Sequence, residues 1–493
     1  MENKLYYGDN LKILREHISD NSIDLVYLDP PFNSGKNYNI LFKEPNGFKS
    51  EAQIKAFDDT WHWTESAENT FHDLVNNGPS KLVDLLKSFR GFLGENDTMA
   101  YLTMMAIRLI ELKRVLKPSG SIYLHCDPTA SHYLKILLDI IYLPNNFRNE
   151  IIWHYRRWTG KARRFQRLHD VIFFYTKSDN YVFNVIYTDY TEGSVERKMQ
   201  GVLHRFKGNE AFLVSEKSVD EKGVRENDVW QIPFIPPSAK ERLGYPTQKP
   251  IELLKRIIMA SSKENEIILD PFCGCGTTID AAIELSRKWI GIDITHLAIN
   301  LIKNRIYDRY KDSIKYKVIG EPEDIHGAIK LASEDRYQFQ WWALSLVKAR
   351  PVNDERKKGA DYGIDGIKFF QDSIVKNDIK KIIIQVKSGH VQVKDIRELI
   401  TVTKNNDGTI GTLITLENPS ENMKREAISE GFYICPFNKT KYPKIQILTI
   451  EDLFKDKNIE YFNVIDETFK KSERHFDKSQ YGKQDAFFNS DES

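Results

Sequence analysis

The sequence predicts an α/β protein whose main domain is built on a largely parallel sheet. First, strand-like apolar runs alternate with helix-like runs over residues 4–141, and this β-α-β-α order requires crossover connections between parallel strands. Second, two strand-like runs end in the same way, at Asp29-Pro30 and at Asp270-Pro271. Because ligands of open α/β sheets bind where the strands end, both motifs are expected at one binding edge.

Length and composition narrow the class of protein. With 493 residues the chain is too long for one ordinary domain, and two or three are expected. The net charge is only +1, so any surface that binds nucleic acid must be local. The four cysteines form no CxxC pair and have no histidine cluster beside them, which argues against a zinc site and a disulfide framework. Since neither a signal-peptide core nor an apolar run of about 18 residues occurs, we expect a cytoplasmic protein without a membrane anchor.

The chain begins with a short strand and a helix. Residues 4–14 (KLYYGDNLKIL) predict a strand that ends at Gly8-Asp9, followed by a helix with Asn10 as its N-cap. Asp9 is therefore a carboxylate at the end of a strand, although helix capping explains it equally well. The expected elements that follow are a polar insertion over 44–98 with a helical patch at 81–92, a helix over 101–115, a turn at 117–120, a strand over 121–125 and a helix over 132–141.

Residues 25–38 (LVYLDPPFNSGKNY) carry the chemistry of this half. The run LVYL predicts a buried strand that must stop at Asp29-Pro30-Pro31-Phe32, because proline has no N–H for a central strand. The Asp29 carboxylate and the Pro30 carbonyl can accept the two hydrogens of a planar amine, while the ring of Phe32 stacks on its ring system. The alternative is a strand-terminating turn with a solvated aspartate.

Residues 151–168 (IIWHYRRWTGKARRFQRL) contain six Arg and Lys, no acid and four aromatics. Such mixtures suit a phosphate backbone and unstacked bases, although a charge run is often only a solvated face. The predicted DNA-contacting side chains are Arg156, Arg157, Lys161, Arg163, Arg164 and Arg167, with the aromatics Trp153, Tyr155, Trp158 and Phe165 among them. A strand is expected over 171–175, and 180–229 is either a target-recognition region or an irregular insertion.

Two further motifs lie between residues 245 and 278. YPTQKP (245–250) precedes an amphipathic helix. EIILDPFCGCGTT (266–278) predicts a strand, a glycine-containing loop and a helix over 279–285, so that the backbone can approach a ligand closely. The third glycine of GxGxxG is missing, which argues against a pyrophosphate loop, and an ordinary glycine turn is the alternative. Asp293, near the end of the next predicted strand, could accept hydrogen bonds from ribose hydroxyls.

In their order along the chain, these motifs resemble those of the β-class amino DNA methyltransferases, which use S-adenosylmethionine (SAM). The resemblance covers about residues 1–310 and implies a circularly permuted, Rossmann-like sheet opened between its second and third strands. Tyr245 departs from the histidine of the family motif HPTxKP. The resemblance implies Asp29, Pro30, Pro31 and Phe32 as the catalytic tetrapeptide. It implies cofactor binding by Asp9, Thr247, Lys249, Asp270, Phe272, Gly274, Gly276, Thr277 and Asp293.

The resemblance also implies the reaction. The amine of a base flipped out of double-stranded DNA would be methylated, with orientation and electrostatics as the main catalytic effects. The DPPF form of the tetrapeptide favours adenine N6, and cytosine N4 is the alternative.

Beyond residue 318 enough chain remains for a further domain. GADYGIDG (359–366) and the strand KIIIQVK (381–387) resemble the Mrr-like branch of the PD-(D/E)xK nucleases. On that resemblance Asp365 and Gln385 hold Mg²⁺ and Lys387 polarises the attacking water. Gln385 replaces the usual acid, so a further acid such as Glu334 is needed.

We therefore expect a methyltransferase domain over 1–318 with target recognition near 180–229, an Mrr-like domain over 319–465 and a polar tail over 466–493. The predicted function is restriction and modification on one polypeptide, with double-stranded DNA as partner and a homodimer as the candidate assembly. The alternatives are a methyltransferase whose C-terminal domain only binds DNA or a partner, a non-catalytic SAM-fold DNA-binding protein, and an RNA substrate.

Overall fold

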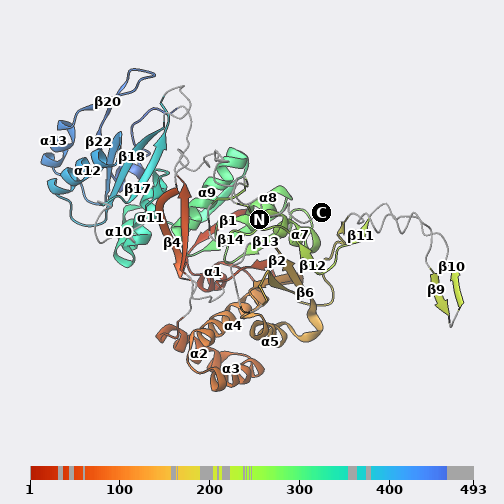
Figure 1. The fold of residues 1–493 in the computed structure, drawn as a ribbon. Helices are drawn as coiled ribbons and strands as arrows, with labels where there is room; N and C mark the ends of the chain where they lie inside the picture. Colours follow the sequence, from red (N-terminus) through yellow and green to blue (C-terminus); the bar gives the residue numbers. More distant parts are fainter. Residues whose placement is uncertain are drawn as a thin grey trace.

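The computed structural model in Figure 1 describes most of the chain. Outside the described residues lie 1, 32–36, 44–48, 59–61, 157–162, 164, 189–203, 208–209, 214–222, 237–238, 240, 244, 246, 353–362, 373–378 and 464–493. The strands β3 (Asn37–Lys43), β4 (Lys49–Asp58), β9 (His204–Lys207) and β10 (Glu210–Leu213) are described as backbone only.

The larger domain is built on a nine-stranded sheet in the order β12-β6-β7-β5-β2-β13-β14-β1-β15. From β5 to β15 all neighbours are parallel, whereas β7 runs antiparallel to both β5 and β6. The α/β prediction with a mostly parallel sheet is thus confirmed. The strands are β1 (Asn3–Tyr7), β2 (Ile23–Leu28), β5 (Leu116–Cys126), β6 (Phe147–His154), β7 (His169–Thr176), β12 (Val229–Gln231), β13 (Ile267–Asp270), β14 (Lys288–Asp293) and β15 (Tyr316–Ile319).

Helices cover both faces of this sheet, because alternate residues of each strand point to opposite sides. Val26 and Leu28 of β2 join one hydrophobic cluster, whereas Leu25 and Tyr27 join the other. The first cluster is closed by α1 (Asn10–His17), α2 (Glu65–Asn77), α3 (Ser80–Leu93), α4 (Asp97–Val115) and α5 (Ser131–Tyr142). The second is closed by α7 (Ile251–Ser261), α8 (Thr277–Glu284) and α9 (His296–Tyr310).

Three local predictions were wrong at their boundaries. Asp9, not Asn10, is the N-cap of α1, because its carboxylate accepts a hydrogen bond from the N–H of Lys12. The segment 117–120 lies within β5 and is accommodated by a register irregularity against β2. Helix α8 begins at Thr277, directly after the glycine loop, and not at residue 279.

The smaller domain has a five-stranded sheet in the order β16-β17-β18-β19-β22, and β18, β19 and β22 run parallel. Its strands are β16 (Arg350–Pro351), β17 (Gly366–Phe370), β18 (Lys380–Lys387), β19 (Ile410–Thr415) and β22 (Ile445–Thr449), with a hairpin of β20 (Phe432–Ile434) and β21 (Lys441–Pro443). Its helices are α10 (Ile325–Glu334), α11 (Arg336–Leu346), α12 (Val393–Asn405), α13 (Glu421–Ser429) and α14 (Ile450–Phe454).

Helix α11 of the smaller domain packs against α9 of the larger one. The backbone N–H of His296 donates to the side-chain oxygen of Gln338 at 3.1 Å. Trp341 packs against a small cluster that contains Tyr245 and Cys275. Of the helices in the described part of the chain, none combines the length and hydropathy that crossing a bilayer requires. In the described part of the predicted recognition region, β8 (Tyr187–Thr188) pairs with β11 (Val224–Arg225) and β9 pairs with β10.

Candidate active site and cofactor pocket

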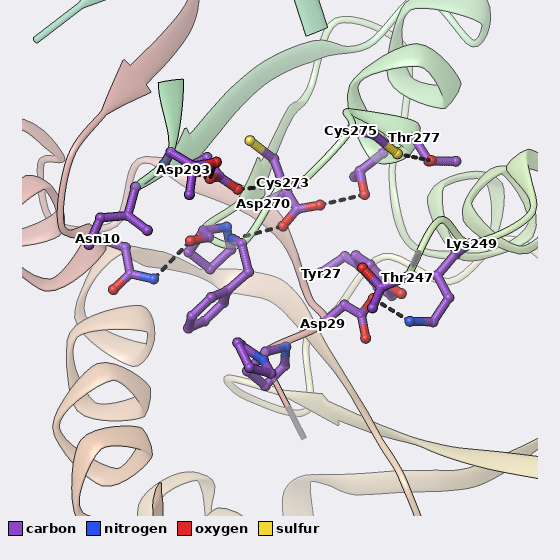
Figure 2. A pocket seen from close by; sticks show the side chains of 18 of the residues that line it. Asn10, Tyr27, Asp29, Thr247, Lys249, Asp270, Cys273, Cys275, Thr277 and Asp293 are labelled. Carbon is purple, nitrogen blue, oxygen red and sulfur yellow. Dashed lines mark hydrogen bonds and ion pairs between the residues drawn. The ribbon is translucent and has the colours of Figure 1, made fainter. Parts of the chain in front are cut away.

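A cavity of about 340 Å³ opens where β1, β2, β13 and β14 end (Figure 2). Parallel pairing explains why distant motifs meet here: β13 lies between β2 and β14, with Leu269 opposite Val26 and Ile290. The carboxylates of Asp29 and Asp270 therefore line one cavity. The sequence prediction that both motifs share a single edge of the sheet agrees with this geometry.

Asp29 follows β2 directly, and its side chain is 15% exposed. Its Oδ2 atom pairs with the ammonium of Lys249. Pro30 and Pro31 line the cavity beside it, while Phe32 lies outside the described residues.

Asp270 lies at the end of β13 and is 3% exposed. Its Oδ1 atom accepts from the N–H of Phe272 at 3.0 Å, and its Oδ2 atom accepts from the hydroxyl of Thr278 at 2.5 Å. Burial nevertheless raises the pKa of Asp270 to about 7, because a buried charge loses its hydration. Asp270 thus changes charge near neutral pH.

The glycine loop brings backbone close to its neighbours. Gly274 has φ +48° and Gly276 has φ +76°, which L side chains rarely adopt. A Cβ on Gly276 would lie 2.7 Å from Ile302, so this glycine lets the loop pack on α9. Gly274 lines the cavity, and its N–H donates to Asp293 Oδ2 at 2.9 Å. Gly276 is not among the lining residues and supports the loop from behind.

Asp293 closes the opposite wall at the end of β14. Its Oδ1 atom accepts from both the N–H and the hydroxyl of Thr295, at 2.9 and 3.0 Å. Burial raises the pKa of Asp293 to about 6. With two buried carboxylates titrating near neutrality, the cavity is suited to a cationic ligand.

Cations inside the chain balance only part of this charge. Asp9 pairs with Arg108 at 2.8 Å, and Asp29 pairs with Lys249. Within the described residues no cationic side chain pairs with Asp270 or Asp293. Asp9 also caps α1, so this residue both caps the helix and lines the cavity.

The segment 245–250 forms the remaining wall, with Thr247 and Lys249 among the lining residues. Tyr245 stands where the family motif has histidine; it is 7% exposed and packs against Gly274. Burial raises the pKa of the Tyr245 hydroxyl well above its ordinary value, so this residue is no acid or base at neutral pH.

A second candidate site lies at β17 and β18 of the smaller domain. The Oδ2 atom of Asp365 accepts from the N–H of Val386 at 2.6 Å, which holds this carboxylate beside β18. The Gln385 side chain is fully buried; its Nε2 atom donates to the carbonyl of Gly363 at 2.7 Å, and its Oε1 atom has no hydrogen-bond partner among the described residues. Lys387 lies 3.7 Å from Asp395.

Glu398 was not predicted from the sequence as a residue of this site. A Cβ on Gly363 would lie 2.8 Å from Glu398 Oε1 and 3.0 Å from Gln385 Nε2, so the glutamate lies next to the glutamine. Glu334, the acid expected to join, is 61% exposed and pairs with Lys330 instead. Over the residues that the structure describes, no three His, Cys, Asp or Glu side chains are grouped as metal ligands.

Two protein-family models match the chain, one in each domain. Residues 23–304 match the model of a family described as DNA methylase, of the N6/N4 type. The chain belongs to this DNA methylase family. Residues 331–434 match a second model, described as restriction endonuclease, so the methylase carries a fused endonuclease domain.

Several relatives of this methylase are known. The type II methyltransferase M.HpaI of Haemophilus parainfluenzae is 27% identical over 353 residues, which are 71% of this chain and 89% of that protein. The DNA adenine methyltransferase YhdJ of Escherichia coli is 27% identical over 306 residues, or 61% and 82% of the two chains. The solved structure of the cytosine-N4-specific PvuII DNA methyltransferase gives a TM-score of 0.39 at 15% identity and covers 63% of this chain and 88% of that one.

The basic segment, residues 151–168, contains both described and undescribed cationic side chains. Arg156, Arg163 and Arg167 are exposed, whereas Arg157, Lys161, Arg164 and Trp158 lie outside the described residues. Phe165 is 99% exposed. Arg167 donates to the hydroxyl of Thr129, which places its guanidinium beside the loop after β5, at the carboxyl edge that holds Asp29.

The structure places Trp153 of this segment in the core, so the prediction that it contacts DNA was wrong. Trp153 is 1% exposed and donates to the carbonyl of Ile232 at 2.9 Å. The hydroxyl of Tyr155 donates to Asp170 at 3.1 Å. The alternation of β6 sends Trp153 into the core, and this period of two was the signal that separates core aromatics from exposed ones.

Proposed function

We propose that this DNA methylase transfers a methyl group from SAM to N6 of an adenine that is flipped out of double-stranded DNA. The observation that carries the proposal is the shared cavity, in which the amine-binding candidate Asp29 lies beside two carboxylates, Asp270 and Asp293, without cationic side-chain partners among the described residues.

The cavity fits SAM by its charge and its backbone. SAM carries an ammonium and a sulfonium, and the two carboxylates offer charges of the opposite sign. The exposed backbone of Gly274 lets an adenosine-sized group approach the loop closely. Bound there, SAM supplies an activated methyl carbon.

The chain's own residues prepare the base. The exocyclic amine of adenine is a poor nucleophile, because its lone pair is conjugated with the ring. Asp29 and the Pro30 carbonyl accept its two hydrogens, which directs the lone pair at the methyl carbon. These acceptors sit on a stiff proline turn, so little reorganisation is needed as charge develops. We assign adenine over cytosine because of the DPPF motif, and a relative named as a DNA adenine methyltransferase supports the assignment.

Nucleoside mass spectrometry tests this proposal directly. DNA from a methylation-deficient host is incubated with the protein and SAM, and its digest should contain N6-methyl-2′-deoxyadenosine. Asp29→Ala should lose this product and still bind SAM in calorimetry. Asp179→Ala, at an 87% exposed carboxylate, is the matched control and should be fully active. N4-methylcytosine as the product would refute the choice of base, and product formation by Asp29→Ala would refute the catalytic role.

We further propose that the C-terminal domain cuts DNA in a Mg²⁺-dependent reaction. Asp365 and Gln385 supply oxygen ligands, and Glu398 is the acid that completes them. The buried Oε1 atom of Gln385 supports this site, because it has no partner within the described part of the chain and a buried oxygen is costly unless a ligand satisfies it. One such site cuts one strand, so double-strand cleavage would require a dimer.

Lys387→Ala and Glu398→Gln should both abolish cleavage of unmethylated DNA in Mg²⁺, with Lys404→Ala on the outer face of α12 as a control that stays active. If the unmodified protein cuts neither methylated nor unmethylated DNA in Mg²⁺, the domain only binds DNA or a partner.

A further inference from the structure

Lys249 is held on a rigid support at the cavity. The side chain of Gln248 donates to the carbonyl of Glu241 at 2.6 Å and accepts from the N–H of Leu243 at 2.8 Å. Pro250 follows as the N-cap of α7, and the N–H of Ile251 donates to the Glu241 carboxylate. The backbone on both sides of Lys249 is therefore fixed, so its side chain has a defined starting point.

The ammonium of Lys249 ends at Asp29. The two side chains are 10% and 15% exposed, and the contact reaches Oδ2 of the carboxylate (Figure 2). Ordering a long lysine side chain costs conformational entropy, and surface pairs rarely offset that cost. Here both side chains are largely removed from water, where losing one partner would leave the other charge buried and unpaired, so the pair fixes the position of the Asp29 carboxylate.

This pair lies in a crowded electrostatic environment. The negative charge of Asp29 contributes to the raised pKa of Asp270, and the positive charge of Lys249 contributes to the lowered pKa of Asp170. The titratable and charged groups around the pair are Asp9 with Arg108, Tyr27, His125, Cys126, Asp170, Tyr245, Asp270 and Asp293. Most of them are acidic or neutral, so Asp29 depends on Lys249 for a nearby counter-charge.

The bond to Oδ2 leaves the second oxygen of the carboxylate available. Among the described residues, the hydrogen bond recorded for Asp29 is the one from Lys249 to Oδ2. A carboxylate has about four lone-pair sites, so Oδ1 can accept an amine hydrogen while Oδ2 stays bound.

We propose that Lys249 is a positioning residue for methyl transfer: it binds Oδ2 of Asp29, fixes the orientation of the carboxylate and presents Oδ1 to the target amine. The inference rests on the proposed function and assigns the lysine of YPTQKP to the catalytic side of the cavity. As the amine nitrogen bonds to the methyl carbon, the carbon–sulfur bond breaks with its electron pair kept by the sulfur, and the positive charge that develops on the nitrogen is lost when one proton passes to solvent water. A carboxylate that is already oriented toward the amine stabilises that developing charge without reorganising.

The alternative role for Lys249 is cofactor binding, which is what the motif resemblance implies. The two roles differ in measurable ways. A cofactor-binding lysine sets the affinity for SAM, whereas a lysine that positions Asp29 sets the rate at saturating SAM.

The test compares Lys249→Met, Lys249→Arg and the unmodified full chain, with Lys255→Met as the matched control. Lys255 lies on α7, outside the cavity lining, and pairs with Glu284. Initial rates of tritiated methyl transfer to unmethylated genomic DNA are measured at saturating SAM from pH 6.5 to 9, and SAM dissociation constants are measured by calorimetry.

Lys249→Met should be about 10²-fold slower at pH 7, since misplacing a reacting group costs about that much, with a SAM dissociation constant within about threefold of the unmodified protein. Lys249→Arg should recover at least about tenfold of the rate, because it restores the charge.

Three results would overturn the inference: a rate deficit that Lys249→Arg does not relieve, a weakened SAM affinity with an unchanged saturated rate, or no deficit at all. The first indicates a purely structural role and the second a cofactor-binding lysine. Absence of methyl transfer by the unmodified protein would refute the proposed function itself. The three results above, obtained with an active unmodified protein, would refute only the role of Lys249.

Discussion

The affinity of the protein for SAM should depend on pH through Asp270. Burial sets the pKa of this carboxyl to about 7, and no cationic side chain among the described residues pairs with it. A cationic ligand binds the ionised form, so protonation competes with binding. Affinity should therefore rise with pH and level off above the pKa.

The expected size follows from the two buried carboxylates. For a group with pKa near 7, the fraction ionised falls from most of the population at pH 7.5 to about one tenth at pH 6, which weakens binding about eightfold. Asp293, with its pKa near 6, adds a factor of about two. The dissociation constant at pH 6 should thus be about 15-fold larger than at pH 7.5.

Isothermal titration calorimetry in two buffers of different ionisation enthalpy measures both the affinity and the protons released on binding. At pH 6.5 binding should release close to one proton. In Asp270→Asn the pH dependence should fall to the factor of about two from Asp293, alongside a loss of affinity. An affinity that is flat between pH 6 and 7.5 in the unmodified protein would refute the assignment of Asp270 as a partner of the cationic ligand.

The raised pKa of Asp270 also predicts how the stability of the fold depends on pH. The folded-state pKa of about 7 lies above the ordinary value of 3.8, so the ligand-free fold disfavours the ionised form and loses stability as pH rises between those values. The full difference amounts to about 4 kcal/mol above pH 7. Asp270→Asn should therefore melt at a higher temperature than the unmodified protein at pH 8 without SAM, and the gain should vanish near pH 4.

The remaining predictions concern the loop, the domain contact and the basic segment. Gly276→Ala should weaken SAM binding and lower the melting temperature, because a left-handed residue gains a clash, and differential scanning calorimetry measures it. Trp341→Ala should cost about 3 kcal/mol of stability and reduce SAM affinity, since its ring packs behind the cavity wall. Arg163→Ala with Arg167→Ala should weaken DNA binding and flatten its salt dependence in fluorescence anisotropy, whereas Trp153→Phe should leave the salt dependence unchanged.

Much of the larger site could be predicted because its parts are local in sequence. Asp29 and Asp270 each follow an apolar run that stops at proline, and parallel strands bring such ends to one edge. Each motif therefore predicts where one strand ends, and the parallel sheet brings the two strand ends to the same edge. The sheet order itself, with β13 between β2 and β14, follows from pairing that no single segment encodes.

The contacts between motifs could not be predicted from the sequence. Lys249 was expected to contact the cofactor, and it lines the cavity, but its pairing with Asp29 was not predicted, because that contact depends on how the turn before α7 is oriented. Glu398 was missed because it belongs to a helix that follows the nuclease motif, and only folding brings it to Gln385. Trp153 was misassigned because composition was weighed above the alternation of the strand.

The contact between the two domains bears on where the methyltransferase domain ends. A boundary near residue 318 separates Trp341 from Tyr245 and Cys275, although these residues share one small cluster. Both Tyr245 and Cys275 also line the cofactor cavity, so one face of that wall is supported by helix α11 of the endonuclease domain. A packed interior has few voids, and removing α11 would leave the back of the wall exposed to water. The lining residues themselves all belong to the larger domain, so α11 supports one wall of the cavity from behind without forming part of it.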